Sequence, residues 1–424
     1  MAASLPRLRA DLDVIPSPLP EQPGLVVRDP LRYSATTLLI PPLLARCLGC
    51  FDGAQDEGDL RARLARLAGE VAVGEAARLL VKALHEAGFL DDQRFAELRA
   101  ARELEFATRV ERPSAHAGGA YPAEPAPLTE TLRGYFDGRP ERAPGPPSSV
   151  SASAPSDVRG IVAPHVSPEG GRTSYVRAYG ALPADHADRI FVVLGTSHYG
   201  EADRYGLTRK PFATPFGLAR TETELVDELA NAAPSAVAIE DYCHAVEHSI
   251  EFQVVFLQYL FGPAVRILPV LCGAFAAGPR ARRLPEASDA VARFIGALGE
   301  LAARGGRQLS FVVGVDFAHV GRRYGDPFAA RAHEGPLTAV AARDRARLDR
   351  VVAGDAGGFW NLVLDQGDQR GNDDLKWCGS SPLYTFLRAL PEARGQILSY
   401  DHWNIDDGSV VSFGALVFPE NQRA

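Results

Sequence analysis

The segment 312-VVGVDFAHVG-321 decides the fold that we expect for this chain. It begins as an apolar run of strand length and ends in two polar side chains, Asp316 and His319. A short apolar run bounded by turn residues is consistent with a fully buried strand. Two polar groups at its end either cap the strand or line a site, and the segment alone leaves both interpretations open.

Two further segments have the same design. "RGIVAPH" ends at His165, and "RIFVVLGTSH" ends at His198. In an open α/β sheet, ligands bind beyond the carboxyl ends of the strands. We therefore expect these imidazoles to reach one edge of a sheet. Cys378, in "DDLKWCGSSPL" before an apolar helix pattern, is a further candidate for the same edge.

From residue 158 onward, strand-like apolar runs alternate with helical patterns. This alternation indicates an α/β sheet with helices on both faces. The expected strands are "RGIVAP", "RIFVVLG", "VRILPVL", "LSFVVGV" and "VVSFGALVF". The expected helices are 221–232, 247–261, 285–303, 337–353 and 381–390.

The first part of the chain, residues 1–108, reads as a separate unit. Its leucines recur at helical spacing, and a helix pattern closes with the turn "GFL". We expect a small, mostly helical, winged-helix-like module that resembles the PqqD-like domains and docks a peptide or a partner. Residues 109–424 then form the α/β domain, with a flexible Pro- and Ser-rich loop at 138–157.

Composition excludes several classes of protein. The net charge of −8 argues against nucleic acid as a partner, because phosphate binding needs clustered basic residues. The N-terminus lacks the apolar core of a signal peptide, and no run approaches the roughly 18 apolar residues of a membrane span. Five cysteines, an odd number, fit reduced thiols. We expect a cytoplasmic protein with no membrane partner.

Histidine and thiolate are ligands of first-row transition metals, so the expected edge of the sheet is a candidate metal site. The segment "AVEHSIEFQVVFLQYLFG" adds His248 on the helix expected at 247–261, between Glu247 and Glu251. The two carboxylates fit a solvated helix start that suits the helix dipole. Alternatively, His248 reaches the pocket as an acid, a base or a substrate anchor.

Several motifs, in order, resemble the Memo family, which is called AmmeMemoRadiSam system protein B in bacteria. "AGGAYPAEPAPLTETL" is similar to its opening motif AGxxYPxxxxxL, and "IVAPHVS" is similar to APHAG. "VVLGTSHYG" resembles the strand with GPSHH, and "EHSIEFQVVFLQYL" resembles EHSIExxLPFLQ. "ILPVLCG", "VGVDFAHVG" and "WCGSSPL" follow in family order. The resemblance covers roughly residues 112–418.

The resemblance implies a fold similar to class III extradiol dioxygenases, with a mixed central sheet flanked by helices. It implies that His165, His198 and Cys378 ligate iron or, alternatively, copper, with zinc a weaker candidate. Asp316, His319 and His248 would be the catalytic residues beside the metal. The family name implies a radical-SAM system partner, and we expect the substrate, whose identity the sequence does not give, to be a small molecule or a peptide.

The chain also departs from the family pattern. Tyr199 stands at the second histidine of GPSHH, and Ser380 and Ser381 stand where the family usually has a pair such as Arg-His. Any anion-binding role at the two serines is therefore in doubt. The APHAG turn is remodelled around Pro168 and Glu169.

Three functions remain open. The leading hypothesis is a non-haem iron oxidoreductase of unknown substrate. The second is a non-catalytic metal-binding adaptor that docks a peptide or a radical-SAM partner through residues 1–108. A zinc hydrolase, in which the metal lowers the pKa of bound water, is the third.

Overall fold

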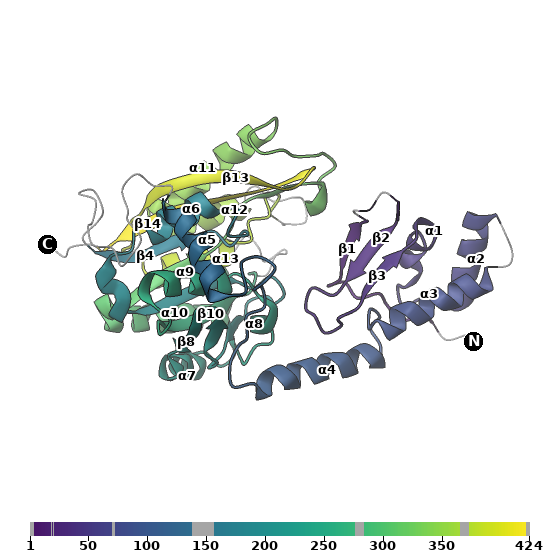
Figure 1. Ribbon diagram of the computed structural model, residues 1–424, viewed down its shortest axis with the longest axis horizontal. Coiled ribbons are helices and arrows are strands. Elements are labelled where there is room, and N and C mark those ends of the chain that lie inside the picture. Colours follow the sequence, from purple (N-terminus) through teal and green to yellow (C-terminus); the bar gives the residue numbers. More distant parts are fainter. Residues whose placement is uncertain are drawn as a thin grey trace. The chain divides into compact units, whose positions relative to one another are not determined.

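A computed structural model describes residues 4–17, 19, 21–69, 73–137, 157–275, 284–364 and 373–420. The chain divides into two compact units, Met1–Thr108 and Arg109–Ala424 (Figure 1). The loop predicted at 138–157 lies, except for Asp157, outside the described residues. No helix in the described ranges has both the length and the apolar character of a membrane span.

The N-terminal unit combines helices with a small antiparallel sheet that the sequence did not reveal. The strands pair in the order β1-β2-β3, and the helices pack on a core that includes Leu60, Leu64, Leu80 and Leu84. Its elements are β1 Asp13–Pro16, β2 Leu25–Arg28, β3 Thr37–Ile40, α1 Pro42–Ala45, α2 Glu57–Ala68, α3 Gly74–Glu86 and α4 Gln93–Thr108. Cys47 and Cys50 are buried in the same core as free thiols.

The second unit is built on an 11-stranded sheet. Its strand order is β12-β14-β4-β11-β5-β10-β6-β9, with β13 paired to β14, β8 to β10 and β7 to β8. The four central strands, β4, β11, β5 and β10, are parallel, whereas β14 runs antiparallel to β4. The strands are β4 Val158–Ala163, β5 Ile190–Thr196, β6 Tyr205–Leu207, β7 Phe212–Thr214, β8 Gly217–Thr221, β9 Val237–Ile239, β10 Arg266–Cys272, β11 Leu309–Gly314, β12 His319–Gly321, β13 Gln396–Asp406 and β14 Ser409–Pro419.

Helices cover both faces of this sheet. Successive residues of β5 belong to different cores: Phe191 and Val193 join the cluster with α5, α6 and α9, while Val192 and Leu194 join the cluster with α7, α10, α11, α12 and α13. Alternation of this kind is required when both faces of a strand are buried. The helices are α5 Pro125–Asp137, α6 Arg172–Tyr179, α7 Thr223–Ala232, α8 Cys243–Val246, α9 Glu251–Phe261, α10 Asp289–Gly305, α11 Leu337–Val352, α12 Ala356–Leu364 and α13 Ser380–Ala389.

This architecture confirms the predicted fold class, a mixed central sheet flanked by helices. All five predicted strands are present, as β4, β5, β10, β11 and β14. The prediction of one helix over 247–261 was wrong at its start, because α8 ends at Val246 and α9 begins at Glu251. Glu247 has extended backbone, and its carboxylate accepts the N–H groups of His248 and Ser249, which holds the chain out of the helix.

Candidate metal centre

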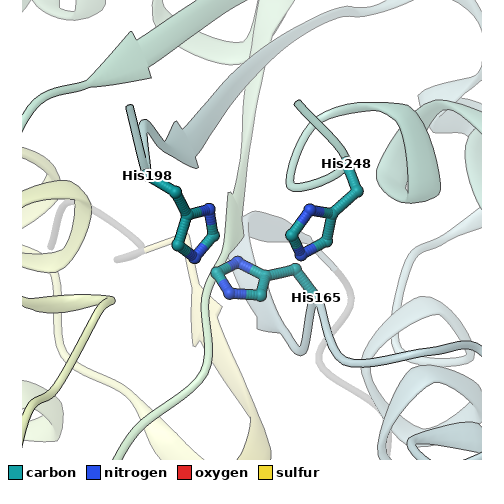
Figure 2. A group of neighbouring side chains, drawn as sticks. All are labelled: His165, His198 and His248. Carbon is teal, nitrogen blue, oxygen red and sulfur yellow. The ribbon is translucent and has the colours of Figure 1, made fainter. Parts of the chain in front are cut away.

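Three histidines from three separate segments meet beyond the carboxyl ends of the parallel strands. His165 follows β4, His198 follows β5, and His248 lies in the break between α8 and α9. One ring nitrogen of each lies within 4.8 Å of the others, and Figure 2 shows the three imidazoles grouped together. The ring centroids are 5.0 to 5.1 Å apart. The geometry therefore forms a candidate site for a metal ion.

Each imidazole is oriented through its Nδ1 atom. His165 Nδ1 lies 3.0 Å from the carbonyl oxygen of Gly314. His198 Nδ1 lies 3.0 and 3.1 Å from the two carboxylate oxygens of Glu247, and His248 Nδ1 lies 3.1 Å from Glu247 Oε1. A donor interaction at one ring nitrogen fixes the tautomer and leaves the other nitrogen to bind a metal. The three Nε2 atoms are thus the available donors.

Glu247 is the residue whose role the sequence reasoning missed. Its side chain is buried, and it also accepts the backbone N–H of His198 at 3.0 Å and of His248 at 2.8 Å. Burial raises the pKa of Glu247, but His198 and His248 lower it by more than burial raises it. The pKa of Glu247 therefore lies well below its ordinary value. Glu247 is therefore a carboxylate that holds two of the three imidazoles. Its position next to His248 in "EHSIE" was the available signal.

Charge is distributed unequally over the cluster. Burial, followed by the neighbouring His198 and His248, lowers the pKa of His165 well below its ordinary value. Burial also lowers the pKa of His198, but Glu247 and Cys378 outweigh it and raise that pKa well above its ordinary value. The pKa values of the two imidazoles are therefore shifted in opposite directions, down at His165 and up at His198.

Cys378 lies next to the histidines, in the loop before α13. Its Sγ is 3.3 Å from His165 Nε2 and 3.6 Å from the carbonyl oxygen of Asp316. Burial raises the pKa of the thiol. The three residues carried over from the family pattern, His165, His198 and Cys378, are thus brought together. Their role as ligands stays a prediction.

Asp316 and His319, which follow β11, border the cluster. Asp316 Oδ1 accepts the backbone N–H of His165 at 3.0 Å, and Oδ2 lies 3.6 Å from His165 Nε2. Burial raises the pKa of Asp316 to about 6. His319 Nδ1 lies 2.9 Å from the carbonyl oxygen of Phe317, and burial lowers the pKa of His319 to about 4. Asp316 therefore touches His165 directly, while His319 is held by the backbone.

A buried ion pair fastens a further segment over the site. Arg112 pairs with Glu251, and Arg112 Nη2 donates to the carbonyl oxygen of Glu247 at 2.7 Å. Glu251 Oε1 accepts the backbone N–H of His116 at 2.9 Å. The His116 ring then packs edge-on against His248, with centroids 5.6 Å apart. Glu251 is therefore a buried structural anchor and not part of a solvated helix start.

The three residues that depart from the family pattern, Tyr199, Ser380 and Ser381, lie close in sequence to His198 and Cys378. Tyr199 is 39% exposed, and its ring centroid lies 6.2 Å from that of His198, which is itself exposed. Ser380 and Ser381 are buried in the first turn of α13, which places two small neutral side chains beside Cys378.

Fold and site together define an α/β protein with a histidine cluster at the carboxyl edge of a mixed sheet. The profile of the family described as Memo-like protein matches residues 112–417. The chain therefore belongs to the Memo family, and the predicted resemblance is confirmed.

Relatives divide according to whether they include the N-terminal unit. A MEMO1 family protein of Aquifex aeolicus is 27% identical over 398 residues, covering 93% of this chain and 95% of the relative. One from Methanopyrus kandleri is 27% identical, covering 73% of this chain and 99% of the relative. One from Pyrococcus abyssi is 30% identical, covering 67% and 90%. The Aquifex match extends into Met1–Thr108, because Arg109–Ala424 is too short to supply 93% of the chain.

Proposed function

We propose that this Memo-family protein is a non-haem iron oxidoreductase. In this proposal His165, His198 and Cys378 hold the metal, and His248 completes the donor set. The observation that carries the proposal is the arrangement of the imidazoles: each Nδ1 faces an oxygen acceptor, and one ring nitrogen of each lies within 4.8 Å of the others. Imidazole and thiolate donors suit iron and copper, and zinc shares these ligands.

The donor set fits a divalent ion in charge as well as in geometry. Glu247 is a buried carboxylate that contacts Nδ1 of His198 and of His248. It would therefore balance the positive charge of a metal bound by these imidazoles. Metal ligands must be deprotonated, so binding would release the proton of His198 and that of the Cys378 thiol. Bound iron supplies one-electron chemistry and open coordination positions for substrate.

The remaining residues position groups and move protons. Glu247 orients two imidazoles, and the carbonyl of Gly314 orients the third. The pKa of Asp316, about 6, lies close to neutrality, so its carboxyl exchanges a proton readily beside His165. His319, kept neutral by burial, is the second proton-transfer candidate. We therefore propose Asp316 as the main proton-transfer residue and His319 as the alternative.

The adaptor hypothesis remains the second candidate. It is favoured by the compact N-terminal unit, which the Aquifex relative shares and which the Methanopyrus relative covers at most in part. An adaptor would bind a peptide or partner protein through Met1–Thr108 and show no turnover with O₂. Oxygen consumption by the iron-loaded full chain, with and without candidate reductants and substrates, separates this function from an oxidoreductase.

The decisive experiment is metal analysis of protein purified without oxygen. We expect about one iron per chain, lost in His165→Ala and in Cys378→Ala. One copper per chain would keep the oxidoreductase and change its metal. Stoichiometric zinc would favour a hydrolase, and folded protein that refuses all three metals on titration would overturn the proposal.

A further inference from the structure

The loop that carries Cys378 has a backbone conformation that its own sequence does not favour. Lys376 in this loop has a φ of 53°, in the left-handed region that residues other than glycine rarely adopt. Such a conformation persists only where the surrounding structure imposes it. The tertiary contacts of the residues next to Lys376 therefore bear on the position of Cys378.

The Trp377 side chain is buried and anchored by several contacts. Its ring stacks on Phe317 with centroids 4.6 Å apart, and the Cζ atom of Arg347 lies 5.3 Å from its ring centroid. Its Nε1 donates a hydrogen bond to Oδ1 of Asp344 at 2.6 Å. An N–H···O bond is directional, so it fixes the in-plane rotation of an indole that stacking alone leaves open.

Asp344 is a buried residue of α11 whose carboxyl group accepts three hydrogen bonds. Besides the indole of Trp377 at Oδ1, it accepts the hydroxyl of Tyr400 at 2.7 Å and that of Ser412 at 2.5 Å, both at Oδ2. Tyr400 belongs to β13 and Ser412 to β14. The two oxygens therefore have different partners: Oδ2 joins Asp344 to the sheet, and Oδ1 joins it to the indole.

Trp377 and Cys378 are consecutive, so a single planar peptide group joins the anchored indole residue to the thiol residue. Beyond this peptide group, Cys378 Sγ lies 3.3 Å from His165 Nε2, and the Cys378 carbonyl oxygen accepts Thr196 Oγ1 at 3.1 Å. Side chains that bind a metal are commonly oriented by partners that do not touch the metal themselves.

We propose that Asp344 is a positioning residue of the candidate metal centre: it fixes the indole of Trp377 and thereby holds the Cys378 sulfur against His165. The proposal rests on the proposed function for the use of Cys378 as a metal ligand, but not for the position of its thiol. Loss of the indole hydrogen bond should release Cys378 while the core of the sheet stays closed.

Alkylation of the metal-free full chain by iodoacetamide tests this, with each cysteine quantified by peptide mass spectrometry. Cys378 is partly exposed, whereas Cys243 and Cys272, in the same unit, are buried. Trp377→Phe and Asp344→Ala should each raise the rate at Cys378 by about fivefold, the population change that one net hydrogen bond produces. Cys243 and Cys272 should keep their wild-type rates.

Two control variants separate the indole contact from the other contacts of Asp344. Asp344→Asn keeps an oxygen for the Trp377 N–H, and the hydroxyls of the two other partners can rotate to accept the amide protons. Tyr400→Phe removes a donor from Oδ2 and spares Oδ1. In both variants the Cys378 rate should stay within about twofold of wild type. If Asp344→Ala does not fold, Trp377→Phe against Tyr400→Phe still makes the comparison.

Cobalt(II) provides a second readout, because a thiolate ligand gives this ion a charge-transfer absorption in the near ultraviolet. Cys378→Ala should abolish that band. Trp377→Phe and Asp344→Ala should weaken cobalt binding by about tenfold, as expected when a partner of a metal ligand is lost, whereas Tyr400→Phe should not.

Unchanged Cys378 alkylation in Trp377→Phe and Asp344→Ala would overturn the proposal. A rise at Cys378 that Cys243 and Cys272 match would also overturn it, because it would show a general opening of the fold. A cobalt spectrum that Cys378→Ala does not change would remove the proposed donor set and leave the alkylation result intact. A Cys378-dependent band with unchanged alkylation rates would remove the role of Asp344 and leave the metal site intact.

Discussion

The two ends of the central parallel strands surround their histidines with different groups. At the amino end, His186 lies beside Ser310, with Ser310 Oγ 3.1 Å from its Nδ1. Close to it, Arg189 donates to Asp157 at 2.6 Å. At the carboxyl end, three imidazoles face one another and share the single carboxylate of Glu247.

The difference separates a single histidine among charged and hydroxyl groups from a group of histidines that could hold a metal ion. At the amino end Arg189 and Arg307 both pair with Asp157, and among the residues that the structure describes no second imidazole faces His186. At the carboxyl end one ring nitrogen of each of three imidazoles lies within 4.8 Å of the others, and His165 Nε2 also lies 3.3 Å from Cys378 Sγ. A histidine at the end of a strand does not by itself identify a candidate site. Several histidines whose ring nitrogens lie close together do identify one.

The largest expected effect is on metal affinity at the carboxyl end. His165→Ala, His198→Ala and His248→Ala should each weaken iron binding by more than about a hundredfold, because each removes a donor. His186→Asn, at the other end, should leave affinity within about threefold. Anaerobic competition titration against a chelator measures both, and equal losses at the two ends would contradict the comparison.

A smaller loss should follow from Glu247→Gln. The amide keeps the volume but supplies only one acceptor for two imidazoles, so metal affinity should fall by about 10- to 100-fold. Glu251→Gln is the matched control, because this carboxylate pairs with Arg112 and not with a clustered imidazole. Glu251→Gln should lower the unfolding free energy and spare metal binding. The reverse result would show that Glu251, not Glu247, organises the site.

At the amino end the expected effect is on stability and its pH dependence. Burial, followed by Arg189, lowers the pKa of His186 to about 4. Because the unfolded chain then binds more protons between about pH 6.5 and 4, stability must fall as the pH falls through this window. From pH 7 to pH 5 the contribution is about 2 kcal/mol.

Denaturant unfolding of metal-free protein at the two pH values measures this term. His186→Asn should flatten the pH dependence by that amount, whereas the exposed His333, replaced in the same way, should not change it. An unchanged slope in His186→Asn would show that other groups carry the pH dependence.

The smallest effect is expected from Ser310→Ala. It removes the hydroxyl beside His186 Nδ1 and should lower the unfolding free energy by about 1 kcal/mol. Metal content should stay at the wild-type value, since Ser310 lies at the start of β11 and the cluster lies beyond its end. A loss of metal in this variant would mean that the two ends are coupled through the strand.

Sequence reasoning found the central strands because they are buried on both faces and read as unbroken apolar runs. It missed β13, whose residues are mostly half-buried at the sheet edge and show no clear alternation. It also missed β1 to β3, which are only four residues each. Short or half-exposed strands carry too little hydrophobic pattern to be recognised.

For the site, the candidate residues came from strand-end position and from family motifs. Their roles depended on distances that no spacing encodes. Glu247 was read as the first turn of a helix because its neighbours have helical periodicity. Its carboxylate instead accepts backbone N–H groups from its own turn and from His198, about fifty residues away in sequence.

The sequence by itself determined the family, the α/β class and the residue types available at one edge of the sheet, since these follow from apolar periodicity and ordered motifs. Only the tertiary structure decided which imidazoles converge, which carboxylate orients them, and that Asp344 accepts the indole N–H of Trp377 next to Cys378. Convergence requires parallel strands to end at the same level, and that is a property of the sheet rather than of any segment.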